Sequence, residues 1–370
     1  MQTLVYSIMH FLTDGACACA MFAYFYGAPD FYLWLLLYNF SAFVLQFPIG
    51  ALMDFIAVRQ RQWKKCSQAD LPLLCTFLSI LFLAAGMFTH PVVLGIGNAL
   101  FHVGGGIGVI REDRRKSLRG QALGIFVAPG ALGLFLFTTL GKQLYTAYPM
   151  VALVMLLMLF AAFSLQFMIV RKQPAIDDAS RMSAALPPHD RNTGRPMLLL
   201  SCSAALAVLL AFLVVVLRSY TGFAVRFAWK SGFLFGLLAT LALVLGKAAG
   251  GIASAHFGTG KTILVSLLAA ALLYFFRDVP AAGIAALFFF NMTMPVTLYL
   301  VTERFPKYPG ASFGLLTVAL FLGFLPQYLQ LPALPAGRFT GTVLALVSLA
   351  LLFTAFLILK REEKRHALSH

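Results

Sequence analysis

Long runs of apolar residues recur along nearly the whole chain, and short polar stretches separate them. A helix of about 18 or more mostly apolar residues can cross the ~30 Å hydrocarbon core of a bilayer. The pattern therefore predicts twelve membrane-spanning helices, and the unbroken runs argue against a β-barrel, whose strands alternate in hydrophobicity. The predicted spans are 5–27, 31–56, 71–89, 90–110, 119–141, 144–170, 196–220, 231–254, 261–277, 281–302, 310–328 and 339–360.

The composition indicates an all-α polytopic membrane protein. Of the 370 residues, 61% are hydrophobic and 11% are charged, whereas about a quarter of the residues in a soluble domain are charged. The first span is not a cleaved signal peptide, because it lacks a basic start and contains His10 and Asp14. The five cysteines are odd in number and suggest no disulfide framework.

Basic residues gather on one alternating set of loops. Cytoplasmic loops carry an excess of Lys and Arg, so we expect a protein of the cell (inner) membrane with both termini in the cytoplasm. The net charge of +15 does not indicate nucleic-acid binding, since the charges lie on separate short loops. The basic set is Arg59, Arg61, Lys64, Lys65, Arg111, Arg114, Arg115, Lys116, Arg119, Arg171, Lys172, Arg181, Arg191, Arg195, Lys261, Arg304, Lys307, Lys360, Arg361, Lys364 and Arg365, against Lys142, Arg226, Lys230, Arg277 and Arg338 on the opposite loops.

A long polar stretch divides the chain into two halves of six spans each. It is rich in proline and charge, as linkers are. We expect an N-terminal bundle at 1–170, a cytoplasmic linker at 171–195, a C-terminal bundle at 196–360 and a cytoplasmic tail at 361–370. Glycines four apart open the fifth span (Gly120, Gly124) and the eleventh (Gly310, Gly314). Matching features at this offset suggest a parallel repeat, as in transporters built from two six-helix halves.

The sequence resembles the major facilitator superfamily. Gly50 and Asp54, followed by Arg59 and Arg61, look like the signature loop between helices two and three of that family. Its second-half copy, 251–261, keeps the glycines but has an alanine in the acidic place. The resemblance implies an alternating-access transporter in which two bundles rock about a central site, commonly driven by a proton gradient.

A narrower resemblance is to the fosmidomycin-resistance-type branch of exporters. It rests on "MHFLTDG", "NFSAFVLQFPIGALMD", "GNALFHVGGG" and "TMPVTLYLVTERFPKYPGASFG", which occur in order along most of the chain. That branch often has Pro-Glu after the Phe-His pair, where this chain has Val103 and Gly104. The branch therefore supplies no substrate for this chain.

Three titratable residues fall inside predicted spans. His10 and Asp14 are four residues apart, so they share one face of the first helix. An ionised carboxylate at mid-membrane costs about 2.5–3.5 kcal/mol on insertion scales, and such groups usually have a function. We predict that Asp14, His10 and His102 carry a coupled proton. The alternative is a structural His–Asp hydrogen bond between helices.

Other polar and small residues are candidates for the substrate site and the gate. His102 lies beside a run of three glycines, which allow close approach of a substrate or a helix. Arg218 either meets an anionic substrate or snorkels to the membrane surface. The predicted substrate-binding residues are His102, Gly104, Gly105, Asn291, Arg218 and Gln46, and the predicted gating residues are Asp54, Arg59, Arg111, Glu112 and Glu303.

These features predict a secondary active transporter that works by alternating access, namely a proton-coupled antiporter exporting a small organic molecule or drug. The alternative is a transporter of a soft or borderline metal ion, copper or zinc. In that case the ligands are His10, Asp14, Cys17 and Met21, one stripe of the first helix, with His102, Met292 and Met294. The sequence has neither an HExxH motif nor a GxxxxGK[ST] loop, so we expect no enzyme activity. The expected partners are the substrate, protons and the lipid bilayer, with no cofactor, and we expect a monomer.

Overall fold

The computed structural model describes residues 1–63, 70–172, 202–331, 337 and 339–368. Every element in these ranges is a helix. Most of the predicted linker 171–195 lies outside the described residues. The same holds for the predicted loop residues Lys64, Lys65, Arg181, Arg191, Arg195 and Arg338.

The twelve predicted spans correspond to helices in the described ranges. Ten of them are long and apolar enough to cross a membrane, and two shorter apolar helices at 71–86 and 259–275 complete the set. The first half contains α1 (Gln2–Cys19) with η1 (Ala20–Tyr24), α2 (Phe31–Asn39) with η2 (Phe40–Val44) and α3 (Gln46–Trp63), α4 (Asp70–Gly86), α5 (Pro91–Arg115), α6 (Gln121–Val127), α7 (Gly130–Gly141) with η3 (Lys142–Leu144), and α8 (Tyr148–Arg171). The second half contains α10 (Cys202–Ala224), α11 (Gly232–Phe257), α12 (Thr259–Phe275), α13 (Pro280–Asn291), α14 (Thr293–Arg304), α15 (Pro309–Tyr328) and α16 (Thr340–Leu368).

Three helices run at least five residues beyond the C-terminal ends of their predicted spans. The prediction ended each span where charged residues begin, but a helix continues into water because its hydrogen bonds lie within its own backbone. The charged block that follows Ile110 is therefore the last part of α5, which ends at Arg115, rather than a loop. Likewise α3 reaches Trp63, and α16 includes the predicted tail as far as Leu368.

Three spans are interrupted where proline removes a backbone donor. The fifth span breaks between α6 and α7 at Pro129, and the tenth breaks between α13 and α14 at Met292, three residues before Pro295. In the second span, the π-helical η2 and a turn at Leu45 precede Pro48. Such interruptions are tolerated in membrane helices where neighbours satisfy the freed carbonyls.

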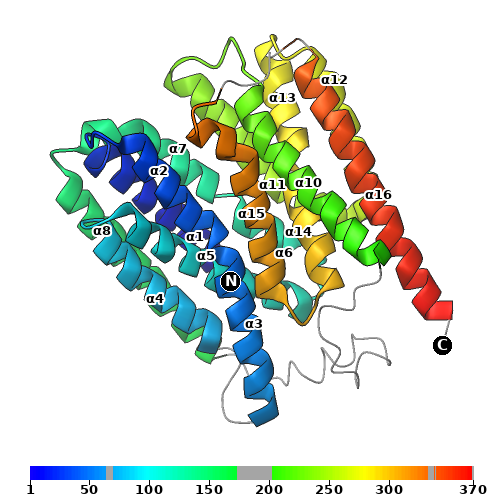
Figure 1. Ribbon diagram of the computed structural model, residues 1–370, viewed down its shortest axis with the longest axis horizontal. Coiled ribbons are helices and arrows are strands. Elements are labelled where there is room, and N and C mark those ends of the chain that lie inside the picture. Colours follow the sequence, from blue (N-terminus) through cyan, green and yellow to red (C-terminus); the bar gives the residue numbers. More distant parts are fainter. Residues whose placement is uncertain (64–69, 173–201, 332–336, 338, 369–370) are drawn as a thin grey trace.

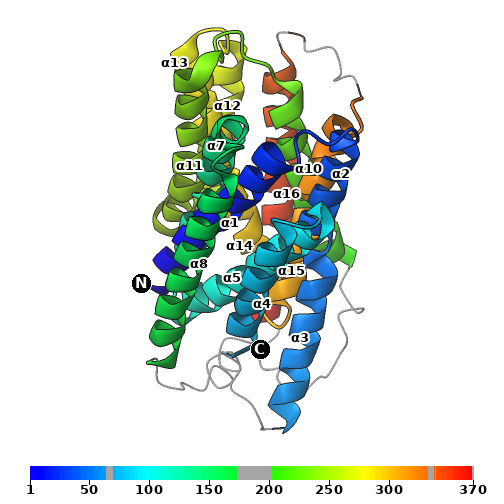
Figure 2. The same cartoon turned by 90° about the vertical axis from the view of Figure 1, so that its left-hand side faces the viewer.

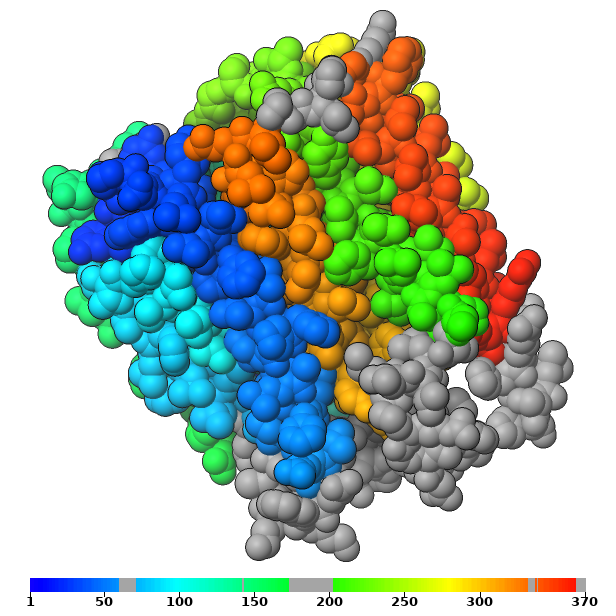
Figure 3. All heavy atoms as spheres, viewed as in Figure 1, coloured from blue at the N-terminus to red at the C-terminus, as the bar shows by residue number. Residues whose placement is uncertain are grey.

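The helices form two lobes, α1–α8 and α10–α16 (Figure 1 and Figure 2). The lobes meet along two seams, α3 against α15 and α6 with α7 against α11. In Figure 3 the orange α15 lies directly beside the blue α2–α3. Glycines make the seams tight, as the GxxxG spacing predicts. A Cβ at Gly50 would overlap the backbone of Gly310, and one at Gly124 would lie 3.1 Å from the Cα of Gly251.

Candidate functional site

The three titratable residues predicted inside the membrane meet in one cluster. Nε2 of His10 lies 3.1 Å from Oδ2 of Asp14 on the next turn of α1. Nε2 of His102, on α5, lies 3.0 Å from Nε2 of His10 and 3.6 Å from Oδ1 of Asp14. Both imidazoles are buried. The cluster therefore joins α1 to α5 at the centre of the N-terminal lobe.

The interruption at Pro129 positions His10. Proline has no N–H, so the carbonyl of Ile125 loses its helical partner and instead accepts a hydrogen bond from Ser7 Oγ at 3.1 Å. The carbonyl of Phe126 lies 2.7 Å from Nδ1 of His10. The break in the fifth span thus supplies the backbone oxygen that orients the imidazole.

The hydrogen bonds determine which nitrogen of each imidazole carries the proton. A carbonyl only accepts, so Nδ1 of His10 donates to Phe126 O, and Nδ1 of His102 donates to Asn98 O at 2.9 Å. In the neutral imidazoles both Nε2 atoms are then lone-pair acceptors, and they face each other and the Asp14 carboxylate. The two Nε2 atoms and the carboxylate are thus three acceptors that converge without a donor among them. A single proton or cation between them would remove the repulsion of their lone pairs.

The surroundings of the cluster leave room for little more than such an ion. A Cβ at Gly130 would collide with Nε2 of His10 and Oδ2 of Asp14. Asn98 donates from Nδ2 to Oδ1 of Asp14 at 3.1 Å. The Asp14 side chain keeps 20% of its surface accessible to solvent. The carboxylate is therefore held on three sides and still reachable by water.

A cavity of about 880 Å³ lies between the lobes, above the cluster and away from the basic ends of the helices. Residues of the first span line it one turn beyond Asp14, beginning at Ala18. Two predicted substrate-binding residues, Arg218 and Asn291, line it as well. Its aromatic lining is Phe22, Tyr38, Phe135, Phe223, Phe227, Tyr274, Phe290, Phe324 and Tyr328.

The other predicted substrate-binding residues lie in packed seams. A Cβ at Gly104 would meet Thr76 and the Pro72 carbonyl on α4, and one at Gly105 would touch Phe126 and Tyr6. Gln46 is buried and donates to the Ala42 carbonyl at 2.6 Å. The glycines let α4 and α6 approach α5 and so place His102. A direct part for these three residues in substrate binding stays a prediction.

The lobes are joined at the basic ends of the helices. Oδ1 and Oδ2 of Asp54 accept hydrogen bonds from the backbone N–H groups of Gly310 and Ala311, at 3.1 and 2.8 Å. This carboxylate caps the N-terminus of α15, where the helix dipole favours negative charge. Arg114 on α5 adds a second tie, because it contacts Glu303 at 3.3 Å and the Thr302 carbonyl.

The remaining predicted gating residues are placed differently. Glu112 accepts from Thr3 Oγ1 at 2.5 Å and from Lys116 Nζ at 2.6 Å, both within its own lobe. Arg59 lies over the ring of Phe55, with 5.1 Å between Cζ and the centroid, also within its lobe. Arg111 lies close enough to Asp54 to interact electrostatically.

Three residues that are not among the predicted site residues are prominent in the structure. Arg114 stands in a run of basic residues and Asn98 is an ordinary helix residue, so neither carried a signal. Lys247 on α11 interacts electrostatically with Asp14 of the opposite lobe and with Arg218 of its own lobe. A lysine within an apolar span was visible in the sequence, but only the packing of the lobes shows that it faces this site.

Of the proposed metal ligands, His10, Asp14 and His102 converge. Their ligand atoms all lie within 4.8 Å of one another. The Cys17 thiol instead accepts a weak hydrogen bond from Asn98 at 3.6 Å, and Met21 lines the cavity. Met292 is buried at the break between α13 and α14, and Met294 packs on the core.

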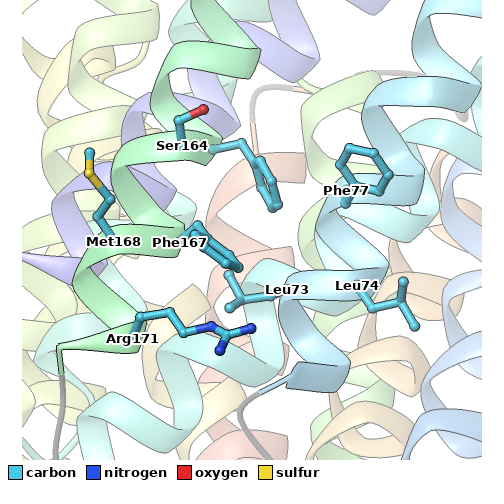
Figure 4. A pocket seen from close by; sticks show the side chains of 8 residues that line it. Leu73, Leu74, Phe77, Ser164, Phe167, Met168 and Arg171 are labelled. Atoms are coloured by element: carbon cyan, nitrogen blue, oxygen red, sulfur yellow. The ribbon is translucent and has the colours of Figure 1, made fainter.

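A second hollow lies between α4 and α8, on the outer wall of the N-terminal lobe (Figure 4). Its lining is apolar except for Ser164 and Arg171. The guanidinium of Arg171 lies 4.9 Å from the centroid of the Phe167 ring. None of the lining residues belongs to the second lobe, so this hollow is not shared between the lobes.

No family model and no curated protein matches the chain. Solved structures do match it over nearly their whole length. One is FucP in the outward conformation, a major facilitator superfamily transporter, with TM-score 0.62 and 14% identity over 96% of this chain and 98% of that one. This chain has the major facilitator fold.

Two further structures with a similar fold are a human organic anion transporter, MFSD10, and a bacterial homologue of the iron transporter ferroportin. The first gives a TM-score of 0.61 at 15% identity, covering 95% of this chain and 99% of that chain. The second gives 0.53 at 12% identity, covering 98% and 100%. At these identities the likeness establishes the architecture of a multi-pass membrane protein in two six-helix lobes.

Proposed function

We propose that the chain is a secondary active transporter that works by alternating access. It couples the inward movement of protons to the export of a small organic molecule, in the cell (inner) membrane with both termini in the cytoplasm. The observation that carries the proposal is the cluster of three acceptors near the middle of α1 and α5, where a proton or cation between His10, Asp14 and His102 would supply the missing donor. In this account the proton binds there and reaches Asp14 from the cavity.

The state of the lobes supports this mechanism. The basic ends are joined by Asp54 and Arg114, while the cavity lies toward the opposite ends. With the basic ends in the cytoplasm, this is an outward-facing arrangement. Protonation from outside, followed by separation of the basic ends, then brings the cluster into contact with the cytoplasm.

Export and antiport rest on the resemblance to the fosmidomycin-resistance branch. The neighbours allow other coupling, since FucP from Escherichia coli is a fucose:proton symporter. The direction of proton movement relative to the substrate distinguishes antiport from symport. We propose antiport because the sequence motifs resemble a branch of exporters.

Replacement of Asp14 tests the proposal. A thermal-shift screen of drugs, sugars, organic anions and metals first supplies a substrate. The purified protein is then reconstituted into liposomes that contain a pH-sensitive dye, and a substrate gradient is imposed. We expect Asp14→Asn to fold and bind the substrate but to move protons no faster than protein-free liposomes, because the cluster has lost its anionic acceptor.

The matched control is Asp30→Asn, which makes the same change at an exposed turn and should leave proton movement intact. Proton movement at the normal rate in Asp14→Asn would remove this carboxylate from the coupling mechanism. Protons moving in the same direction as the substrate would replace antiport by symport.

A second candidate is transport of copper or zinc as the substrate. The convergence of two imidazoles and a carboxylate favours it, since these are ligands of borderline metals. Calorimetry of the reconstituted protein with Zn²⁺ and Cu²⁺, together with metal flux in the same liposomes, separates the two. Metal flux that is lost in His102→Gln would favour the metal transporter over the proton-coupled exporter.

A further inference from the structure

We propose that the cavity between the lobes binds an amphipathic organic anion, whose acidic head group pairs with Arg218 while its apolar body lies among aromatic side chains. This names the substrate class of the transporter proposed above and rests on that proposal. The head group is a carboxylate, sulfonate, phosphate or phosphonate, because a guanidinium presents a planar fork of N–H donors that fits these groups.

Arg218 is buried without a full set of partners. The residue is 8% exposed, lines the cavity, and its Nη1 has no hydrogen-bond partner among the described residues. A buried cation is costly unless it is paired. A snorkelling arginine would extend its guanidinium into water near the helix end, so burial with a free donor argues against that reading and for a missing anion.

The charges around the cavity all have the same sign. Arg226 and Lys230 line it near the end of α10, and among the described lining residues none is acidic. Lys247 lies close enough to Arg218 to repel it. Asp14 is not among the lining residues, and its carboxylate accepts a hydrogen bond from Asn98. A concave site with charges of one sign concentrates ligands of the opposite sign.

The remaining lining fits an apolar body of drug size. Both lobes contribute rings, with Phe22 and Phe135 from the first and Phe227, Phe290 and Phe324 from the second. The volume of about 880 Å³ falls within the range of small-molecule sites, roughly 300–1,000 Å³. An inorganic anion would leave most of this surface uncovered. The lining therefore favours an anion that carries aromatic or aliphatic bulk.

Three probes of nearly equal shape test the proposal. They are 2-naphthylacetate, 2-(2-naphthyl)ethanol and 2-(2-naphthyl)ethylamine, which carry a negative, a neutral and a positive head group at neutral pH. Binding to the purified full-length protein in detergent is measured by calorimetry without any gradient. We expect the anion to bind about tenfold or more tightly than the alcohol, because a charged hydrogen bond to Arg218 is formed, and we expect the amine to bind weakest.

The variant Arg218→Gln should remove this preference, so that the acid and the alcohol bind equally. Lys261→Gln removes one positive charge from an exposed site at the opposite end and should keep the preference. If Arg218→Gln does not yield a monodisperse protein, Arg218→Lys is used, which keeps the charge but loses the fork. It should weaken the acid several-fold and leave the alcohol unchanged.

Equal binding of all three probes to the wild type would overturn the proposal, and so would an anion preference that survives both changes at Arg218. These outcomes concern binding alone. Failure of the proton-coupled function would appear as normal proton movement in Asp14→Asn with the anion preference intact. The two proposals therefore fail in different measurements.

Discussion

The two lobes share a repeated helical plan but differ in the chemistry that they place at or beside the cavity, since only the C-terminal lobe lines it with charged residues. The N-terminal lobe offers an acceptor-only cluster, His10, Asp14 and His102, that attracts a proton or cation. The C-terminal lobe offers Arg218 and Lys247, which attract an anion. One architecture thus carries two chemistries, because the repeat conserves helix packing while side chains at the cavity are free to differ.

The two seams differ in a related way. Asp54 of α3 caps α15, whereas Ala255 stands in the acidic place of the second-half copy on α11. Glycine contacts are common to both seams. Close backbone packing is therefore common to both seams, whereas the carboxylate cap made by Asp54 belongs to the seam between α3 and α15.

The largest expected effect comes from adding one methyl group in the N-terminal lobe, with the same change in the C-terminal lobe as its control. Gly130→Ala should abolish proton coupling although no titratable group is changed, because its Cβ would displace His10 from Asp14. Overpacking of this kind also costs about 1–3 kcal/mol of stability. Proton movement in dye-loaded liposomes and a thermal melt measure the two consequences.

The matched change in the other lobe is Gly222→Ala, where the nearest atom is 3.8 Å from the added Cβ. Gly222 lines the cavity, but the added methyl group meets no atom closer than ordinary contact distance, so proton movement and the melting temperature should stay nearly unchanged. If Gly130→Ala also couples normally, the cluster has more freedom than its packing indicates, and the contrast between the lobes is weakened.

An intermediate effect is expected at the seams. Asp54→Asn replaces an ionised cap by a neutral amide, which loses charge-assisted hydrogen bonds worth about 1.5–3 kcal/mol. The basic ends should then separate in a larger fraction of molecules. Distances between spin labels on cysteines placed at the exposed Arg59 and Lys261 report this, one label on each lobe. An unchanged distance distribution would show that the Asp54 cap is not needed to keep the basic ends together.

The smallest expected effect comes from the charge of Lys247 in one lobe acting on the cluster in the other. Lys247 lies close enough to Asp14 and His102 to oppose the binding of a proton. Lys247→Gln removes that repulsion, so the midpoint of the pH profile of transport should move to higher pH, by about one pH unit or less. No shift would mean that the charge of Lys247 does not act on the cluster in the other lobe, and a shift to lower pH would contradict the repulsion proposed here. Lys261→Gln is again the control.

The fold could be predicted from hydropathy because each segment that crosses a bilayer must satisfy its own backbone and face lipid. The limits of the spans were less accurate, since α5 continues as a helix through Arg115 after apolar residues end. The pairing of His10 with Asp14 follows from their spacing on one helix. The Asn98 carbonyl that orients His102 is likewise four residues away on the same helix. That His102 meets His10 and Asp14, and that the Phe126 carbonyl orients His10, depends on how three helices pack, which spacing along the chain does not encode.

The position of Phe126 has a consequence for how proton affinity and lobe movement are related. Its carbonyl holds the His10 imidazole, and two residues earlier in α6 Gly124 touches the backbone of α11 in the opposite lobe. In the proposed mechanism, a sliding of α11 along α6 would shift the oxygen that orients the imidazole. The two contacts are only two residues apart, so a movement between the lobes would reach the proton-binding cluster through about half a helical turn.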